Sequence, residues 1–312
     1  MAEKLYDLIV AGEINPDLIL TGDVLPEFGQ VEKLVDSAAL TIGSSSAIFA
    51  CGAARLGLSV AFVGVCGDDV FGRFMLAEMQ KRDVDVSNVL IRENGQTGIS
   101  VILNRGSDRA ILTHPGLIAA IRAEDVTDDL LRQARHLHIA SYFMQTALQP
   151  GLPDLFRQAR VLGLTTSLDT NYDPAEKWTG FDELLSVTNV FLPNEKEALS
   201  LSGEVNVDVA ADRLGSKVEA LAIKLGAAGA LGISGTQKVR VASIPAKVVD
   251  TVGAGDSFDA GFLYGYLHNW RLEQTLRLAC VCGALSTQKA GGTGSQPTLA
   301  EALQYRPKLM MG

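Results

Sequence analysis

The sequence predicts an α/β fold with a central, mostly parallel sheet, helices on both faces of that sheet, and a small additional β-sheet. Short apolar runs alternate with amphipathic segments of about 10–15 residues, as in parallel strands joined by helical crossovers. The apolar runs are continuous, which is typical of strands buried on both faces. Two β-rich insertions, near 15–42 and 96–115, interrupt the alternation. We therefore expect 1–312 to form one domain whose insertions pair in a lid.

The expected strands are short apolar runs bounded by turn-forming residues. Two of them flank Gly106 and Ser107, a pair that indicates a hairpin. In chain order the expected strands lie at 5–14, 59–67, 97–104, 109–114, 136–141, 165–170, at the start of 189–203, and at 218–226, 230–234 and 239–244.

The expected helices carry apolar residues at helical spacing. Phe258, Phe262 and Tyr266, for example, follow one another at i, i+4 and i+8. Serines at 44–46 suit the N-cap of the first helix. In chain order the expected helices lie at 44–56, 69–83, 152–163, the second part of 189–203, the stretch after Asp256, and 272–289.

The composition argues against several classes of function. The 312 residues carry a formal net charge of -9, and nucleic acid is not an expected partner because phosphate-backbone binding needs a basic face. No apolar run reaches the roughly 18 residues that span a membrane, and the N-terminus has no signal-peptide pattern. We expect a cytoplasmic protein with no membrane partner. Each cysteine lies in an apolar segment and is expected to be a reduced core residue: Cys51, Cys66, Cys280 and Cys282.

The stretch DTVGAGDSFDAGFLYG at 250–265 carries the strongest chemical signal. Gly253, Ala254 and Gly255 precede an expected helix, so their backbone N–H groups would face an anion at the helix N-terminus. Asp256 is expected to stay ionised there. It would accept the proton of an acceptor hydroxyl while the amides stabilise charge on a transferring phosphoryl group.

Other interpretations of this stretch can be weighed against that chemistry. Asp256 could simply cap the helix, which is a common role for aspartate. A P-loop is excluded because the chain contains no Gly-Lys pair. A dinucleotide fingerprint is disfavoured because Phe258 stands where its third glycine is needed.

The stretch DTVGAGDSFDAGFL resembles, nearly residue for residue, the C-terminal signature of the ribokinase-like (PfkB) carbohydrate kinases. Further motifs of that family follow in the same order: GEINPD at 12–17, IGSSSAIFACGAARLG at 42–57, PNEKEA at 193–198 and KLGAAGAL at 224–231. The resemblance extends from residue 5 to about 300. It implies a ribokinase-like fold, with ATP as the phosphoryl donor and a sugar as the acceptor.

The resemblance also implies roles for individual residues. Asp256 would be the catalytic base, and 253–255 would form the anion hole. Asn194 and Glu197 would hold Mg²⁺ through water, in keeping with the hydration that this ion retains. Taken alone, Glu197 could be a solvated helix acid and Lys224 a surface lysine. The residues implied to bind ATP are Asn194, Lys224, Gly226 and Gly229.

The segment STQKAGGTGS at 286–295 resembles the family's monovalent-cation loop, which makes K⁺ an expected further cofactor. Its glycines would bring backbone carbonyls close to an ion. A plain flexible loop is the alternative. The implied ligands of the cation are Asp250, Val252, Ser286 and Gly291.

The substrate side is implied by the first motifs and by the lid. The lid would close over the sugar and exclude water. Ile42 and Ala47 depart from the family's glycine signature, and the second change weakens an assignment to ribose. Arg109 could equally be a charge on a hairpin edge, while His114 and His138 are expected to be structural. The residues expected to contact the substrate are Asn15, Asp17, Gly43, Ser44, Arg109 and Ser141.

A second departure concerns sugar acids. Asp173 stands where ketodeoxygluconate kinases of the family carry an arginine that pairs with the substrate carboxylate. Because two carboxylates repel each other at close range, the sequence disfavours a sugar acid as substrate.

The sequence therefore predicts ATP-dependent phosphorylation of a hydroxyl on a neutral sugar, such as fructose or a related ketose or pentose. A nucleoside kinase is the first alternative, disfavoured because Phe28 is the only aromatic residue of the first insertion and the second has none. A catalytically silent sugar-binding regulator and a dehydrogenase are further alternatives. Lids often pair in this family, so a homodimer through the lid is expected.

Overall fold

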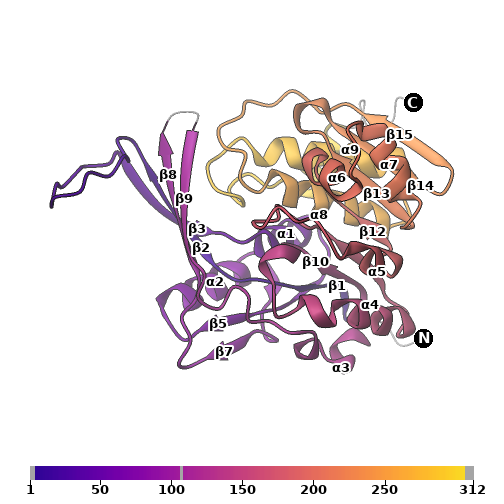
Figure 1. The fold of residues 1–312 in the computed structure, drawn as a ribbon, viewed down its shortest axis with the longest axis horizontal. Coiled ribbons are helices and arrows are strands. Elements are labelled where there is room, and N and C mark those ends of the chain that lie inside the picture. The colour runs from indigo at the N-terminus through magenta and orange to yellow at the C-terminus, as the bar shows by residue number, and fades with distance from the viewer. Residues whose placement is uncertain (1–3, 106–107, 306–312) are drawn as a thin grey trace.

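The computed structural model describes residues 4–105 and 108–305 (Figure 1). Its main sheet has nine strands. They are β1 (Tyr6–Ala11), β4 (Val60–Val63), β6 (Val84–Asp85), β10 (Ala134–Ile139), β11 (Thr165–Leu168), β12 (Val190–Phe191), β13 (Ala220–Lys224), β14 (Ala230–Ser234) and β15 (Gln237–Val241).

The main sheet is mostly parallel, as the sequence predicts. The strand order is β15-β14-β13-β12-β11-β10-β1-β4-β6. All pairs from β13 to β6 are parallel, whereas β14 and β15 join antiparallel at one edge. The carboxyl ends of the parallel strands therefore meet along one side, where ligands bind in open α/β sheets.

Helices cover both faces of this sheet. On β1, Leu8 and Val10 belong to a core shared with residues of α1, α8 and α9, while Ile9 and Ala11 belong to a second core shared with residues of α4, α5 and α7. This alternation is the period-two pattern of a strand between two layers. The α-helices are α1 (Ser45–Arg55), α2 (Val70–Gln80), α3 (Asp128–Leu131), α4 (Leu152–Val161), α5 (Phe181–Ser186), α6 (Glu195–Ser202), α7 (Val207–Gly215), α8 (Ala254–Leu267), α9 (Leu272–Ser286) and α10 (Leu299–Leu303).

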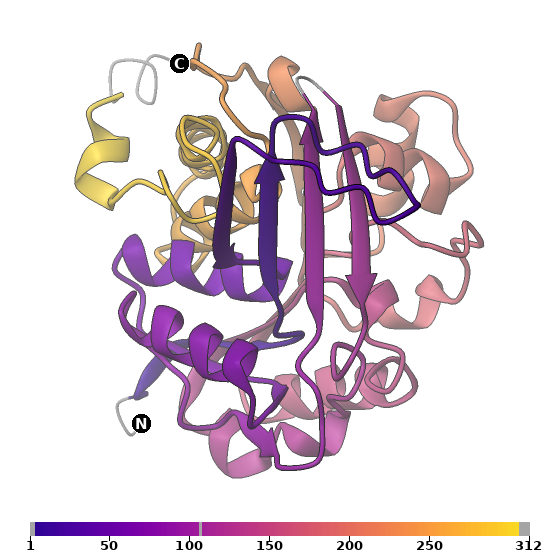
Figure 2. The same cartoon turned by 90° about the vertical axis from the view of Figure 1, so that its left-hand side faces the viewer.

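The two insertions form one small four-stranded sheet, as expected (Figure 2). It contains β2 (Pro16–Thr21), β3 (Ser37–Ile42), β8 (Ile99–Arg105) and β9 (Asp108–His114), in the order β3-β2-β8-β9. β2 and β8 pair parallel across the two insertions, and the outer pairs are antiparallel. The strands of the expected hairpin are therefore present, while its turn at Gly106 and Ser107 lies outside the described residues. The sheet projects from one side of the molecule (Figure 1).

Smaller elements complete the chain. The expected strand 59–67 is divided, because β5 (Val65–Gly67) leaves the main sheet and pairs with β7 (Leu90–Arg92). Short 3₁₀ turns lie at Ala123–Asp125, Tyr142–Met144, Gln149–Gly151 and Gly226–Ala228.

The first strand ends earlier than the expected 5–14. β1 stops at Ala11, and the chain then runs close to the start of α1. A Cβ placed on Gly12 would lie 1.9 Å from Ser46 Oγ, so this position accepts only glycine. After the strand ends, residues 12–15 form a buried loop that faces the site described below.

Two further expectations concern the cysteines and the membrane. All four cysteines are buried and free of disulfides, as expected for core residues. Within 4–105 and 108–305, no helix has the length and apolar character needed to cross a bilayer.

A pair of histidines is buried in β10. The ring nitrogens of His136 lie 2.7 Å from Thr165 Oγ1 and 2.7 Å from Ser167 Oγ, and His138 Nδ1 also lies 2.7 Å from Ser167 Oγ. The ring of His138 stacks on Phe49. Burial lowers the pKa of His138 to about 3 and that of His136 well below its ordinary value. Both rings are therefore neutral in the folded protein.

We expect the contribution of His136 and His138 to the free energy of unfolding to fall as the pH drops below about 6.5, the ordinary pKa of histidine. The unfolded chain binds protons there, whereas folded His138 does so only near its pKa of about 3. Each histidine contributes up to about 1.4 kcal/mol per pH unit. The free energy of unfolding is measured with urea at several pH values between 7.5 and 5.5. Its slope against pH should be smaller for His138→Phe than for wild type. His114→Gln, at an exposed histidine, is the control, and equal slopes in all three proteins would contradict the assignment.

Candidate active site

The glycine turn stands at the start of α8, as the sequence predicts. Gly253 is the N-cap residue with φ 73°, and a Cβ there would lie 2.6 Å from the Cα of Gly292. First-turn amides have no intrahelical acceptors, although the amide of Ala254 donates to the carbonyl of Thr251 at 3.3 Å. Asp256 lies inside the first turn and is 7% exposed. The alternative that Asp256 is the helix cap is therefore wrong, because Gly253 holds that position.

Two cavities meet at this turn. A polar cavity of about 500 Å³ lies on one side, with Asp256 in its wall and with side chains from β8 and β9 lining it. A second cavity of about 610 Å³ lies on the other side and is lined by Gly229 and Phe258. Thr251 and Gly255 line both cavities. A ligand that reaches from one cavity to the other would pass the amides of the turn.

The polar cavity brings together most of the residues predicted for the substrate. Gly43 does not line it, but a Cβ on Gly43 would lie 2.3 Å from Asp17 Oδ1, so this glycine allows the close approach of that carboxylate. The predicted residues that line the cavity are Asn15, Asp17, Ser44, Arg109 and Ser141.

Three residues with positive φ angles line the polar cavity. Ser44, Ser141 and Asn171 have φ of 62°, 51° and 52°. The amide Nδ2 of Asn171 donates to Ser45 Oγ at 2.6 Å and to Ser141 Oγ at 2.7 Å. Such conformations are uncommon outside glycine and gather at functional sites. Sequence reasoning missed Asn171, although it follows β11 at the end of the sheet where ligands bind.

A buried carboxylate at the base of the polar cavity was also missed. Glu13 Oε2 accepts a hydrogen bond from Ser46 Oγ at 2.6 Å and one from Gln145 Nε2 at 3.3 Å. The Ser44 hydroxyl donates to the backbone carbonyl of Glu13 at 2.8 Å. Burial raises the pKa of Glu13. Its position just after β1 was the available signal, since the carboxyl ends of parallel strands gather polar groups.

The other acids of the cavity are also perturbed. Burial raises the pKa of Asp17 to about 6, although the charge of Arg109 opposes the shift. Burial, followed by the charge of Asp169, raises the pKa of Asp256 to about 8. A pKa of about 8 runs against the expectation that Asp256 stays ionised, because desolvation outweighs the helix N-terminus. A base whose pKa lies near the working pH is well suited to proton transfer.

Lys224, predicted to bind ATP, lies in a buried charge cluster. Its Nζ is 2.9 Å from Asp169 Oδ2 and 3.0 Å from Asp259 Oδ2. Although burial opposes both shifts, the ammonium lowers the pKa of Asp169, and the two carboxylates raise that of Lys224. Burial raises the pKa of Asp259 well above its ordinary value. We therefore assign to Asp259 the proton that lies between its carboxyl group and that of Asp169. The alternative of a surface lysine is wrong.

The cluster lies directly behind the glycine turn. A Cβ on Gly255 would lie 3.6 Å from Lys224 Nζ. Lys224, Gly226 and Gly229 line the second cavity, as expected for residues on the nucleotide side. Gly229 has φ 100°, and a Cβ there would lie 1.9 Å from the carbonyl oxygen of Val241. The positive charge of Lys224 thus lies close to the amides that would hold a phosphate.

Asn194 and Glu197 form the first turn of α6. Glu197 N donates to Asn194 Oδ1 at 2.9 Å, and Asn194 N donates to Glu197 Oε2 at 2.9 Å. Glu197 is buried, and burial followed by the charge of Asp169 raises its pKa to about 7. It is therefore not a solvated helix acid. Asn194 lines the polar cavity and Glu197 lines neither cavity. Mg²⁺ prefers oxygen ligands, and these two side chains supply them. Because each oxygen already accepts a hydrogen bond, the ion would be held through water.

The segment after α9 is tied to the glycine turn. Asp250 Oδ1 accepts from the amide of Val252 at 3.0 Å, and Asp250 Oδ2 accepts from that of Gly291 at 3.0 Å. The carbonyl of Ser286 accepts from Ser295 Oγ at 2.7 Å. Asp250 thus links Val252 and Gly291, whereas Ser286 is bonded to Ser295, which is outside the predicted set. Among the described residues, no three His, Cys, Asp or Glu side chains form a metal-binding group, so a K⁺ here would rely on carbonyl oxygens.

The sequence argument against sugar acids assumed that Asp173 faces the substrate, and the structure does not support that assumption. Both carboxylate oxygens of Asp173 accept hydrogen bonds from backbone amides of its own loop, those of Ala175, Lys177 and Trp178. Asp173 does not line the polar cavity. It therefore organises a loop and does not face a substrate. Phe28 is 99% exposed and lines neither cavity, so it offers no platform for a nucleobase.

Comparison with known proteins places this geometry in a family. The sequence model described as "pfkB family carbohydrate kinase" matches residues 6–299. An uncharacterized sugar kinase of Archaeoglobus fulgidus is 34% identical over 79% of this chain and 98% of its own. An ATP-dependent ribose-1-phosphate kinase of Halopiger xanaduensis is 30% identical over 93% and 95%. Ribokinase of Arabidopsis thaliana, solved with ribose and ATP, has a TM-score of 0.85 at 24% identity over 98% and 99%.

We expect two substitutions in the buried charge cluster to lower the free energy of unfolding by different amounts. Lys224→Met leaves buried carboxyls without their cation and should lower the free energy of unfolding by about 3–5 kcal/mol. Asp259→Asn keeps a neutral donor beside Asp169 and should cost less than about 1.5 kcal/mol. Urea unfolding at pH 7.5 measures both. Equal losses in the two variants would show that the shared proton has been assigned to the wrong carboxyl.

Proposed function

Because the chain belongs to the pfkB family of carbohydrate kinases, we propose that it transfers the γ-phosphoryl group of ATP to a hydroxyl of a neutral sugar. The observation that carries this proposal is the position of Asp256 and the glycine turn where the polar cavity and the second cavity meet. One cavity would hold the acceptor and the other the nucleotide, with the reacting groups between them.

The proposed mechanism follows from that arrangement. ATP lies in the second cavity, and its γ-phosphate reaches the amides of 253–255 at the N-terminus of α8. The acceptor hydroxyl lies beside Asp256, which takes its proton as the new oxygen–phosphorus bond forms. The bond between the γ-phosphorus and the β–γ bridging oxygen breaks, and ADP leaves. The amides and the ammonium of Lys224 stabilise the charge on the transferring group.

The proposed cofactors act on the same charge. Mg²⁺, when bound through water at Asn194 and Glu197, would neutralise part of the charge on the phosphates. K⁺ at the segment that includes Asp250 and Gly291 would support the glycine turn, to which that segment is hydrogen-bonded and packed.

The polar cavity favours an acceptor rich in hydroxyl groups. Glu13, Asp17 and Asp256 offer carboxyl oxygens that accept hydrogen bonds from hydroxyls, and Asn15 adds an amide. Arg109 is the only Lys or Arg among the residues that line this cavity. A neutral sugar therefore fits better than a polyanion, and the absence of Phe28 from the lining disfavours a nucleoside.

A sugar phosphate is the second candidate, for a specific reason. Arg109 stands on β9 in the cavity wall and is 42% exposed in its side chain. Its Nη1 lies 3.9 Å from Asp250 Oδ1, so an anionic substituent would share the guanidinium with that carboxylate. The Halopiger xanaduensis relative is named a ribose-1-phosphate kinase. This substrate belongs in the same test.

The proposal also includes a homodimer formed through the small sheet. Leu112 on β9 and Leu40 on β3 are exposed and lie on one face of the small sheet. Phe28 and Leu34, in the loop between β2 and β3, are exposed as well. Apolar side chains gathered on one projecting element are typical of an interaction surface. Pairing of two such sheets would cover them.

The proposed function is tested by ADP release from Mg-ATP in the presence of fructose, ribose, ribose-1-phosphate and adenosine in turn. We expect one sugar to support turnover. Asp256→Asn should reduce kcat by several orders of magnitude, while ATP binding stays close to wild type, because the base acts in the transition state. Wild-type turnover in Asp256→Asn would contradict the assigned base. Turnover with adenosine alone would move the chain to the nucleoside kinases.

The pH dependence of kcat/KM reports on the same base. Asp256 must be ionised to accept a proton, and its pKa is raised to about 8 by burial. We therefore expect kcat/KM to rise with pH and to level off above about 8. The charge of Glu13 contributes to that pKa, so Glu13→Gln should move the limb to lower pH. A limb below pH 6 in the wild type, or an unmoved limb in the variant, would contradict this account.

A further inference from the structure

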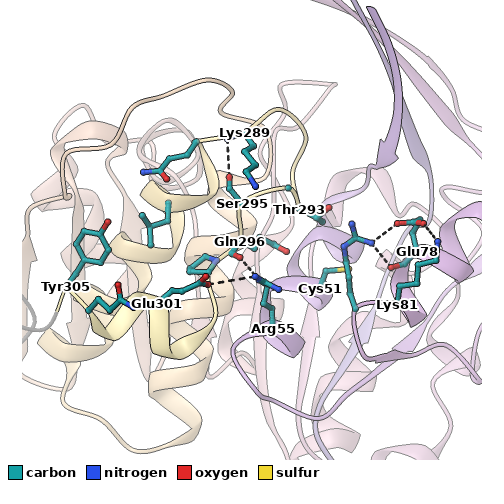
Figure 3. A pocket seen from close by; sticks show the side chains of 16 residues that line it. Cys51, Arg55, Glu78, Lys81, Lys289, Thr293, Ser295, Gln296, Glu301 and Tyr305 are labelled. Carbon is teal, nitrogen blue, oxygen red and sulfur yellow. Dashed lines mark hydrogen bonds and ion pairs between the residues drawn. The ribbon is translucent and has the colours of Figure 1, made fainter.

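A third cavity lies away from the glycine turn and shares no lining residue with the two cavities of the candidate site. It has a volume of about 740 Å³. One wall comes from α1 and α2, and the other from the end of α9 and the chain around α10 (Figure 3). Its size is within the range of small-molecule sites, roughly 300–1,000 Å³. Neither the proposed reaction nor its cofactors use this cavity.

The lining of the third cavity is basic, although the chain as a whole has a net charge of -9. Its two acids are already engaged. Glu78 pairs with Lys81 at 2.6 Å and with Arg82 at 2.7 Å, and Glu301 Oε2 accepts from the amide and hydroxyl of Thr298. Four cations against two acids leave a surplus of two positive charges. The cations are Arg55, Lys81, Arg82 and Lys289.

Two of these cations have donors to offer a ligand. The Nε of Arg55 donates to the carbonyl of Gln296 at 2.6 Å, while its Nη2 lies 3.8 Å from Glu301 (Figure 3). That bond orients the guanidinium of Arg55, which is a lining residue of the cavity. Within the described part of the chain, no ion pair involves the ammonium of Lys289. The hydroxyl of Thr293 lines the same wall, whereas that of Ser295 already donates to the carbonyl of Ser286 and accepts from the amide of Lys289.

A cavity that combines an oriented guanidinium, an ammonium outside any ion pair and a threonine hydroxyl is suited to a phosphate ester. Surplus positive charge in a concave site also concentrates anions. We propose that this third cavity binds a phosphorylated small molecule.

The wall of the third cavity is also the support of the glycine turn. Gln296 Nε2 donates to the carbonyl of Ile48 at 2.9 Å and to Ser257 Oγ at 3.1 Å, and Ser257 follows Asp256 in α8. Earlier in the same segment, Gly292 packs against Gly253. A ligand that engages this segment therefore has a path of direct contacts to the anion hole. The bound ester would modulate phosphoryl transfer, an effect that rests on the proposed function, whereas the binding itself does not.

The binding is tested by calorimetric titration with inorganic phosphate and ribose 5-phosphate as separate probes. Lys81→Glu and Lys289→Glu each reverse one charge in the cavity. Lys177→Glu makes the same change on an exposed loop outside the cavity lining and serves as the matched control. We expect at least one probe to bind about tenfold more weakly to both cavity variants, with an unchanged Kd for the control. Thermal melts confirm that all three variants are folded.

Each outcome decides between clear alternatives. A Kd that is equal in cavity and control variants, or the absence of binding by every probe, would overturn the site. A tight-binding probe should also change the wild-type kcat/KM, and this change should be lost in Lys289→Glu. Binding without any change in rate would overturn the coupling to the glycine turn. A protein that binds the probe at this cavity but phosphorylates no acceptor would contradict the proposed function and leave the binding site standing.

Discussion

The contact between Gly253 and Gly292 is the constraint on which the rest of the site depends. The backbone of the turn approaches that of the segment after α9 so closely that a Cβ on Gly253 would lie 2.6 Å from the neighbouring Cα. This approach places the start of α8 between two cavities and aims its first-turn amides at their junction. It also joins the turn to Asp250 and Gly291, and through Gln296 to the third cavity. The two cavities of the candidate site therefore meet at this backbone contact, and the third cavity is connected to it through Gln296.

Burial of acids is the second property of the site. Glu13, Asp17, Glu197 and Asp256 are all nearly inaccessible, and burial raises the pKa of each. The ammonium of Lys224 lies near them, and its charge opposes the rise in the pKa of Glu197 and of Asp256. Such a site is costly when empty and is relieved when hydroxyls, phosphates and cations enter. The same low dielectric strengthens the interactions that would stabilise the transferring phosphoryl group.

Much of this site could be predicted because its residues are neighbours in the sequence. The glycine turn with Asp256, and Asn194 with Glu197, are local motifs whose geometry follows from the start of a helix. Glu13, Asp169 and Asn171 could not be found this way, since each is an ordinary residue after a strand until the parallel sheet brings the strand ends together. Asp173 failed for the opposite reason. Its position in a motif suggested a contact with substrate, but local amides satisfy its carboxylate first.

The fold was predictable because its period-two and helical patterns are strong, and the small sheet was predictable because its insertions break the alternation. The central claim is that the turn holds the transferring phosphate while Asp256 faces the acceptor. The most direct measurement is a crystal structure with a non-hydrolysable ATP analogue and the sugar that supports turnover. This account places the γ-phosphate on the amides of 253–255 and a sugar hydroxyl within about 3 Å of the Asp256 carboxylate. A γ-phosphate bound away from the turn, or an acceptor outside the polar cavity, would contradict it.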